Sequence, residues 1–298
     1  LSVTSKIHST ANFIEILGLE GVTWQNLKGA HGYRDRLYYD CISIHYNGAE
    51  NMGIWLELTG QGCRVFETLG NGNYEEIFAL VQDNPREMNI TRLDVAADDL
   101  DGLLDIDQLC KDTRANEFVS RFQDWQVIEG SKGSSVTHGS MSSDVFLRIY
   151  DKARERGFND GRHWIRCEIQ LRRERAQKFA FLRGSIGQDF AGVLLNYLRY
   201  IDPDVTDSFR WRWPLKGYWQ NFIGVAARIS LYEKPGMDYN LCNLEDFVYK
   251  QCGNAIDTLI KIKGYAKFAG DLRQRGTAQN PKYQRLLDDH YGRMKKTV

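Results

Sequence analysis

The sequence predicts an α+β fold, in which a curved, mostly antiparallel β-sheet with packed helices is followed by a helical C-terminal portion. Strand-like alternation of apolar and polar residues recurs up to Arg172, and helical spacing dominates after it. The 298 residues are 42% apolar and 12% aromatic, which is enough for one large domain or two packed lobes. We therefore predict a strand-rich region over residues 1–185 and a helical region over residues 186–298.

The first expected elements are a helix, a strand and one arm of a hairpin. Residues 10–18 have the pattern of a short capped helix, and residues 37–46 alternate as a strand. Residues 54–59 alternate again. They are followed by Gly60-Gln61-Gly62, which predicts a flexible turn.

Helical and strand patterns continue to alternate along the middle of the chain. Residues 74–83 and 105–115 have helical spacing, and residues 88–97 between them alternate as a strand that places Asp94 on its polar face. The stretch 129–143 is rich in Gly and Ser, which predicts a mobile loop or the tip of a hairpin.

Two strongly alternating strands come next, at residues 144–152 and 163–172. The polar face of the first carries Phe146, Arg148, Tyr150 and Lys152. The polar face of the second carries Trp164, Arg166, Glu168, Gln170 and Arg172. Beyond this point the spacing predicts helices at about 172–182, 187–201, 214–224, 244–262 and 281–295.

Cysteine usage and the absence of targeting signals limit the class of protein. The six cysteines are scattered without C-x-x-C pairs, which favours free thiols over disulfides or structural zinc. No run of about 18 uncharged apolar residues occurs, and the first residues lack the order of a signal peptide. We therefore expect a soluble, cytoplasmic protein with no membrane partner.

The formal net charge of zero hides a strong asymmetry along the chain. Residues 67–107 carry eleven Asp or Glu against two Arg, whereas residues 148–178 carry ten Lys or Arg against five acids. Residues 251–298 are basic again, with ten Lys or Arg against four Asp. A basic face beside an acidic one suits a protein that holds both phosphates and a metal, although solvated surface helices give the same pattern.

The segment from Phe146 to Glu155 places the phenol of Tyr150 between the cations Arg148 and Lys152. A tyrosine with a pKa near 10 is a poor nucleophile at neutral pH, and flanking cations favour the phenolate while holding a phosphate. A phosphotyrosine ester preserves the energy of a phosphodiester, so such a residue suits transient DNA joining. An ordinary solvated strand carries the same spacing.

Three acids, Glu57, Asp94 and Glu168, lie on the polar faces of different expected strands. Carboxylates that converge from adjacent strands form a hard oxygen site for Mg²⁺ or Mn²⁺, which polarises a phosphate. Arg92 and Arg166 share faces with two of these acids, so a purely structural charge network is the alternative.

Two common kinds of site are missing from the sequence. No G-x-x-x-x-G-K-[ST] motif occurs, so the chain has no evident ATP site and would need a separate helicase to unwind DNA. The six histidines are dispersed, and no two are separated by a single residue, so the two-histidine metal site of many nicking enzymes is absent.

The sequence resembles the replication initiation factors of rolling-circle plasmids and the related relaxases of conjugative elements. The resemblance spans most of the chain. Its sharpest blocks, in the family's order, are Leu56–Phe66 (LELTGQGCRVF), Thr91–Asp99 (TRLDVAADD), Thr137–Glu155 (THGSMSSDVFLRIYDKARE) and Ile165–Arg172 (IRCEIQLR).

This resemblance implies that Tyr150 attacks a phosphodiester at the double-strand origin, keeps the 5′-phosphate and releases a primer 3′-hydroxyl. Arg148 and Lys152 would assist it. The family uses a carboxylate-bound divalent metal, Mg²⁺ or Mn²⁺, and the matching blocks give that role to Asp94 and Glu168, with Glu57 as a third ligand. The resemblance further implies a homodimer, a recruited host helicase and an origin contact in the C-terminal part.

Three other functions remain to be weighed. A relaxase of a conjugative element runs the same chemistry at a transfer origin. A non-catalytic DNA-binding protein would use Arg148, Lys152 and Arg166 only to hold phosphates, with a steep salt dependence and no metal requirement. A tyrosine recombinase is disfavoured, because the basic and histidine residues of that class are not found around a tyrosine in the expected helical setting.

Overall fold

The computed structural model describes residues 1–131, 133–158, 160–228, 248 and 253–275. The chain divides into two compact units, Leu1–Ser230 and Leu231–Val298. The sequence predicts a boundary at 185/186 instead. The difference arises because helices α7 (Ile186–Tyr197) and α8 (Gly217–Ala226) bury apolar side chains in the core of the first unit.

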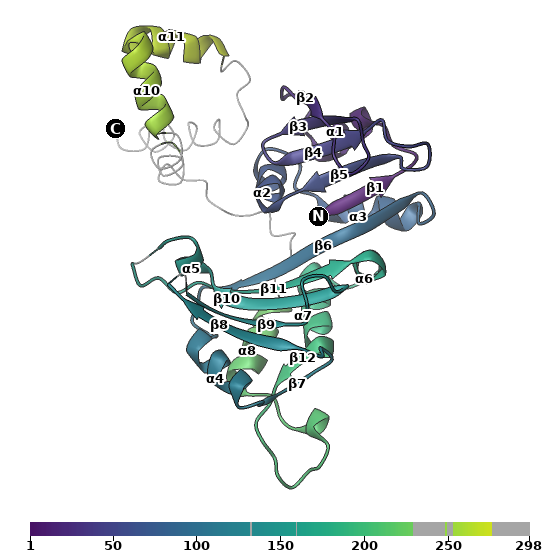
Figure 1. The fold of residues 1–298 in the computed structure, drawn as a ribbon, viewed down its shortest axis with the longest axis vertical. Helices are drawn as coiled ribbons and strands as arrows, with labels where there is room; N and C mark the ends of the chain where they lie inside the picture. The colour runs from purple at the N-terminus through teal and green to yellow at the C-terminus, as the bar shows by residue number, and fades with distance from the viewer. Residues whose placement is uncertain (132, 159, 229–247, 249–252, 276–298) are drawn as a thin grey trace, which may run out of the picture. The chain divides into compact units, whose positions relative to one another are not determined.

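The first unit is built on a ten-stranded antiparallel sheet that is not closed, in the order β2-β3-β4-β5-β1-β6-β11-β10-β9-β8 (Figure 1). This confirms the α+β fold expected from the sequence. A separate two-stranded sheet pairs β12 with β7. The strands are β1 (Ser2–Ser5), β2 (Gln25–Lys28), β3 (Asp35–Tyr39), β4 (Ile42–Tyr46), β5 (Ile54–Leu58), β6 (Met88–Asp99), β7 (Phe118–Ser120), β8 (Trp125–Gly130), β9 (Gly133–His138), β10 (Val145–Asp151), β11 (Ile165–Arg172) and β12 (Leu198–Tyr200).

Helices precede, follow and cover these strands. Their N-termini are mostly capped by side chains, as at Ser9, Thr59, Asn73, Asp105 and Ser185. Besides α7 and α8, the helices with bounds in the described residues are α1 (Thr10–Leu17), α2 (Gly60–Thr68), α3 (Tyr74–Asp83), α4 (Ile106–Arg114), α5 (Lys152–Glu155), α6 (Arg173–Phe179), the 3₁₀ helix η1 (Arg210–Arg212), and, in the second unit, α10 (Gly253–Lys263) and α11 (Tyr265–Arg275).

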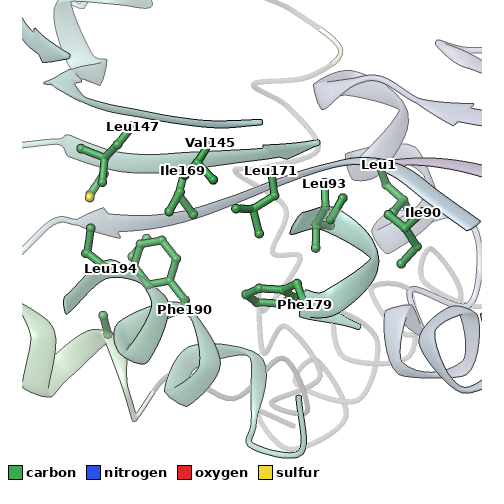
Figure 2. Close-up of a cluster of buried hydrophobic side chains, with 14 of the residues drawn as sticks. Leu1, Ile90, Leu93, Val145, Leu147, Ile169, Leu171, Phe179, Phe190 and Leu194 are labelled. Carbon is green, nitrogen blue, oxygen red and sulfur yellow. The ribbon is translucent and has the colours of Figure 1, made fainter. Parts of the chain in front are cut away.

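The core lies between one face of the long strands and the helices that follow them. Alternate residues of β6, β10 and β11, such as Leu93, Leu147 and Ile169, point toward Phe179 of α6 and Phe190 of α7 (Figure 2). Because side chains of a strand alternate between faces, burying this set leaves the even-numbered residues of β10, of β11 and of β6 from Arg92 to Asp98 on the other face. Burial of one face of these strands therefore determines which of their residues lie on the face opposite the core.

Two local expectations from the sequence are wrong. Residues 37–46 form the hairpin β3–β4 rather than one strand, because Asp40 and Cys41 both adopt positive φ, 36° and 70°, and turn the chain. Gly60 begins helix α2 instead of a turn, since the Thr59 side chain caps the backbone of Gly62. A Cβ at Gly62 would collide with the Cys41 carbonyl group, which explains the glycine.

Other expectations fall partly outside the described residues. The sequence predicts either a mobile loop or the tip of a hairpin at residues 129–143, and this stretch contains the turn of the β8–β9 hairpin. The helix expected at 244–262 is described only as α10, from Gly253, and the one expected at 281–295 lies outside the described residues.

Four of the six cysteines lie in the described residues. The four cysteines that the structure describes are free, and Cys110 and Cys167 are buried. Cys242 and Cys252 lie outside the described residues. Among the helices of the described ranges, none is long and apolar enough to cross a membrane.

Buried His138 makes the stability of the first unit depend on pH. The ring is fully buried against Phe118 and near the Tyr200 hydroxyl, and burial lowers its pKa to about 3. The unfolded chain protonates this ring below its ordinary pKa of 6.5, whereas the folded chain resists protonation. The contribution of His138 to the free energy of unfolding is therefore fully present above pH 6.5. It is lost as the pH falls toward 3, by about 1.4 kcal/mol per pH unit.

We expect the melting temperature to fall between pH 7 and pH 4.5, and the variant His138→Phe to show a smaller fall. Circular dichroism melts at both pH values measure this. Wild-type and variant proteins with equal falls would contradict the assignment to His138. Some dependence remains in the variant because burial also lowers the pKa of His8 and His45.

Candidate active site

Three neighbouring strands bring most of the expected site residues onto one face of the sheet. Across β10, β11 and β6, the cross-strand rows are Tyr150, Arg166 and Asp98; then Arg148, Glu168 and Ala96; then Phe146, Gln170 and Asp94. Residues two apart on a strand share a face, so all nine side chains project from the face opposite the core. The alternation in the sequence correctly predicts this face.

The Tyr150 phenol contacts charged side chains of this face. Its hydroxyl donates a hydrogen bond to Oε2 of Glu168 at 3.2 Å. The guanidinium of Arg148 stacks over its ring at 3.8 Å, and the same Glu168 oxygen lies 3.8 Å from Arg148 Nη2. These contacts leave Tyr150 only 4% exposed, although the polar-face pattern suggests an exposed ring. The cover includes Arg148, whose side chain is itself 39% exposed.

The electrostatic balance at Tyr150 differs from the one that the sequence suggests. Burial is the largest influence and raises the pKa of the phenol, and the charge of Glu168 raises it further. Arg148 and Arg166 lower it, but their combined effect is smaller. Arg148 thus favours the phenolate, as the sequence suggests, but burial and Glu168 outweigh it, so the free protein keeps Tyr150 protonated.

Lys152 differs from its expected place on the strand. Strand β10 ends at Asp151, whose side chain caps the short helix α5 by accepting from the Arg154 backbone N–H at 2.9 Å. Lys152 is the first residue of that helix and is only 5% exposed. Its ammonium group lies 5.3 Å from the centre of the Tyr150 ring and pairs with Glu155 at 2.7 Å. Burial lowers its pKa.

Asp94 and Glu168 lie on neighbouring strands, one cross-strand row apart, with side chains 29% and 26% exposed. Mg²⁺ is commonly bound by one or two carboxylates together with water and phosphate oxygens, so the chemistry of this pair fits such an ion. Arg92 engages Asp94 with its Nη2 at 2.7 Å from Oδ2, and a metal bound there would have to displace it. In the described part of the chain, no group of three His, Cys, Asp or Glu side chains is arranged to hold a metal.

Glu57 stands apart from these two acids in the sheet. It lies on β5, which is separated from β6 by β1, and its cross-strand partner is Ser2 of β1. Two strand spacings put its backbone about 10 Å from β6. His45 Nε2 lies 3.9 Å from its carboxylate. Arg92 is the common neighbour, since the charges of Asp94, Glu168 and Glu57 all raise its pKa.

Two further groups belong to this face although sequence reasoning gave them no role in catalysis. Asp98 holds Arg166 in a two-pronged ion pair at 2.7 and 2.6 Å, in the same cross-strand row as Tyr150. Asp98 follows Asp94 by four residues on one strand, and this even spacing could have placed both acids on the same face from the sequence alone. Arg64, on α2, is half-buried, and its pKa is lowered first by burial and then by repulsion from Arg156 and Arg166. Assigning Gly60–Gly62 to a turn concealed that α2 brings this cation toward the site.

The comparisons with known proteins agree with this architecture. Residues 88–274 match the replication initiation factor family, and residues 2–82 match the N-terminal domain of rolling-circle replication initiation proteins. The chain is 34% identical to the rolling-circle replication initiator protein of Geobacillus stearothermophilus, with a TM-score of 0.70 over 78% of this chain and 96% of that one.

A second relative is NicK of Bacillus subtilis (strain 168), described as a DNA relaxase. It is 29% identical over 259 residues, which cover 80% of this chain and 73% of NicK. The first of the two family matches alone covers more than half of the chain. The resemblance seen in the sequence is thereby confirmed, and the chain belongs to the replication initiation factor family.

Proposed function

We propose that this protein starts rolling-circle replication of a plasmid by nicking, and later rejoining, one DNA strand at the double-strand origin through Tyr150. Membership of the replication initiation factor family supports the nicking function. The observation that carries the assignment to Tyr150 is its hydrogen bond to Glu168, beneath the Arg148 guanidinium, on the face of the sheet opposite the core.

In the proposed reaction, the Tyr150 oxygen forms a bond to phosphorus and the bond from phosphorus to the 3′-oxygen breaks. The phenol proton passes to Glu168, whose Oε2 already accepts it as a hydrogen bond at 3.2 Å. The leaving 3′-oxygen takes a proton from water. One phosphodiester replaces another, so the released 3′-hydroxyl can reverse the step without ATP.

Arg148 has two roles in this proposal. In the free protein it covers the Tyr150 ring. When DNA binds, the Arg148 guanidinium moves from the Tyr150 ring to the scissile phosphate. This movement exposes the phenol, and the guanidinium then stabilises the charge of the transition state. Lys152 and Arg166 remain beside the ring and favour the phenolate once the phosphate draws Arg148 away.

Rolling-circle initiators and relaxases are generally metal dependent. We propose that Asp94 and Glu168 hold Mg²⁺ or Mn²⁺ when DNA is bound, with Glu57 as a third donor. Such an ion would polarise the phosphate oxygens. For this chain's own residues, the consequence is that Arg92 must release Asp94.

The division of work between the two parts of the chain follows from this proposal. Residues 1–185 contain every residue assigned to nicking and joining. Residues 186–298 would contact DNA or a second protomer, and the described helices α10 and α11 carry the basic residues Lys261, Lys263, Lys267 and Arg273. Origin DNA, a second copy of the chain and a host helicase are the proposed partners.

A relaxase acting at the transfer origin of a conjugative element is the second candidate, favoured by the similarity to NicK. Both candidates share the chemistry and differ in the DNA that is cut. Supercoiled plasmids carrying fragments tiled across the replicon that encodes the protein separate them, because only the fragment with the true origin is nicked.

The same plasmids test the proposed function. We expect open circles from one fragment, only with Mg²⁺ or Mn²⁺, and none in the presence of a chelator. Gel electrophoresis measures the conversion. Binding without nicking of any fragment, at every metal concentration, would favour the non-catalytic DNA-binding alternative.

A further inference from the structure

The loop at residues 202–214, between β12 and α8, projects away from the large sheet (Figure 1). Its two ends are held together, because Ile201 forms a β-bridge with Leu215 and the Asp202 N–H donates to the Pro214 carbonyl at 2.9 Å. The short helix η1, with sequence RWR, lies in the second half of the loop. The loop is therefore a closed projection with its own internal structure.

Hydrogen bonds hold this loop in one conformation. Asp207 receives two bonds from the Arg212 guanidinium, at 2.8 and 2.7 Å, and its carbonyl accepts from Trp213 Nε1 at 2.6 Å. Arg210 reaches back to the Phe118 carbonyl at 3.1 Å and to the Asn116 carbonyl. The loop is thus preorganised on β7 and does not need to fold when something binds it.

The held conformation exposes large apolar side chains. Phe209 is 62% exposed and Trp211 is 42% exposed. The Arg212 guanidinium covers one side of Phe209, at 4.4 Å from the ring centre, and Arg121 and Arg199 each lie 5.9 Å from the Trp211 ring. Rings held in water by a rigid loop mark a binding surface rather than a solvated turn.

Two cations beside the Trp211 ring, Arg121 and Arg199, and one over the neighbouring Trp213 ring, Arg210 at 5.5 Å, are held by main-chain carbonyl groups. Among the described residues, Arg121 donates to the Asn196 carbonyl, Arg199 to the Trp211 and Trp213 carbonyls, and Arg210 to those on β7 and before it. Main-chain carbonyls are neutral acceptors, so the positive charge is not cancelled as it is in a pair with a carboxylate. A surface of exposed rings between uncancelled guanidiniums suits an anionic partner with flat apolar faces.

We propose that Phe209 and Trp211 form a stacking platform for the unpaired bases of single-stranded DNA, whose phosphates lie against Arg121, Arg199 and Arg210. This inference rests on the proposed function, because nicking at an origin leaves a displaced single strand. Duplex DNA does not offer the faces of its bases, so the platform selects unpaired strand over duplex.

A second copy of the chain is the other occupant to consider. Two identical platforms facing each other across a two-fold axis would bring the same three guanidiniums together, and like charges across an interface are unfavourable. Single-stranded DNA supplies the opposite charge to the same cations. The charge of the patch therefore favours DNA.

The test is the affinity of the full-length protein for a fluorescently labelled oligothymidylate, measured by anisotropy, with a hairpin duplex of equal charge as comparison. Each of Trp211→Ala and Phe209→Ala should weaken oligothymidylate binding about tenfold and leave duplex binding within about twofold. Trp211→Phe keeps a ring and should retain most of the affinity. Trp125→Ala is the matched control, since Trp125 is 38% exposed on β8.

Unchanged oligothymidylate affinity in both alanine variants would overturn the proposal, as would equal losses for oligothymidylate and duplex. Intact oligothymidylate binding together with a smaller mass by sedimentation would show that the patch joins two copies instead. Oligothymidylate contains no origin, so this result does not depend on cleavage. If the wild-type protein nicks no origin but the alanine variants still lose oligothymidylate affinity, the proposed function is disproved and the proposed stacking platform is supported.

Discussion

Replacing Tyr150 by Phe is expected to abolish nicking of supercoiled origin DNA, with a loss of about a thousandfold or more. The variant lacks the oxygen that attacks phosphorus. It keeps the ring that packs under Arg148, and it loses one hydrogen bond, to Glu168. The fold and DNA binding should therefore remain, and gel conversion of supercoiled to open circular DNA measures the loss.

Tyr218→Phe is the matched control for this variant. Its hydroxyl also donates to a carboxylate, that of Asp112 at 2.8 Å, but it lies on α8 and not on the site face. We expect that control to nick at nearly the wild-type rate. A Tyr150→Phe protein that still nicks and still becomes joined to DNA would show that another residue is the nucleophile.

Glu168→Gln is expected to slow nicking by about a hundredfold or more while preserving the shape of the side chain. Glu168 accepts the Tyr150 proton, and the proposal also makes it a metal donor. The sign of the effect is informative, because the charge of Glu168 raises the pKa of Tyr150. If Glu168 acted only through that charge, its removal would lower the pKa of the phenol and speed nicking.

Single-turnover rates with and without saturating Mg²⁺ measure this effect. Glu129→Gln, which removes a surface carboxylate paired with Arg114 at 2.8 Å, serves as the control and should change little. A Glu168→Gln protein that nicks as fast as wild type, or faster, would remove Glu168 from both of its proposed roles.

The sequence predicted the structure correctly where the apolar–polar periodicity of one segment was enough to determine it. Alternation over residues 144–152 and 163–172 correctly placed Arg148, Tyr150 and Glu168 on one face, because burying one face of a strand determines the other. The cross-strand rows that add Asp98 depend on the register between strands, which a single strand's pattern does not contain.

Other features depended on contacts between distant segments. The Asp40–Cys41 turn has none of the usual Asn-Gly or Asp-Gly signals, so two strands looked like one. Arg64 reaches the neighbourhood of Arg166 only because α2 packs where the sequence suggested a turn. The raised pKa of Tyr150 follows from burial, whereas the sequence showed only the cations beside it.

The most direct test of the account is to identify the residue that carries DNA after cleavage of a single-stranded origin oligonucleotide. Trypsin should release the adduct on the peptide Ile149–Lys152, since it cuts after Arg148 and Lys152. Mass spectrometry of the digest should find the 5′-phosphate end of the oligonucleotide on Tyr150. An adduct on any other residue, or efficient cleavage with no protein-linked DNA, would contradict the mechanism.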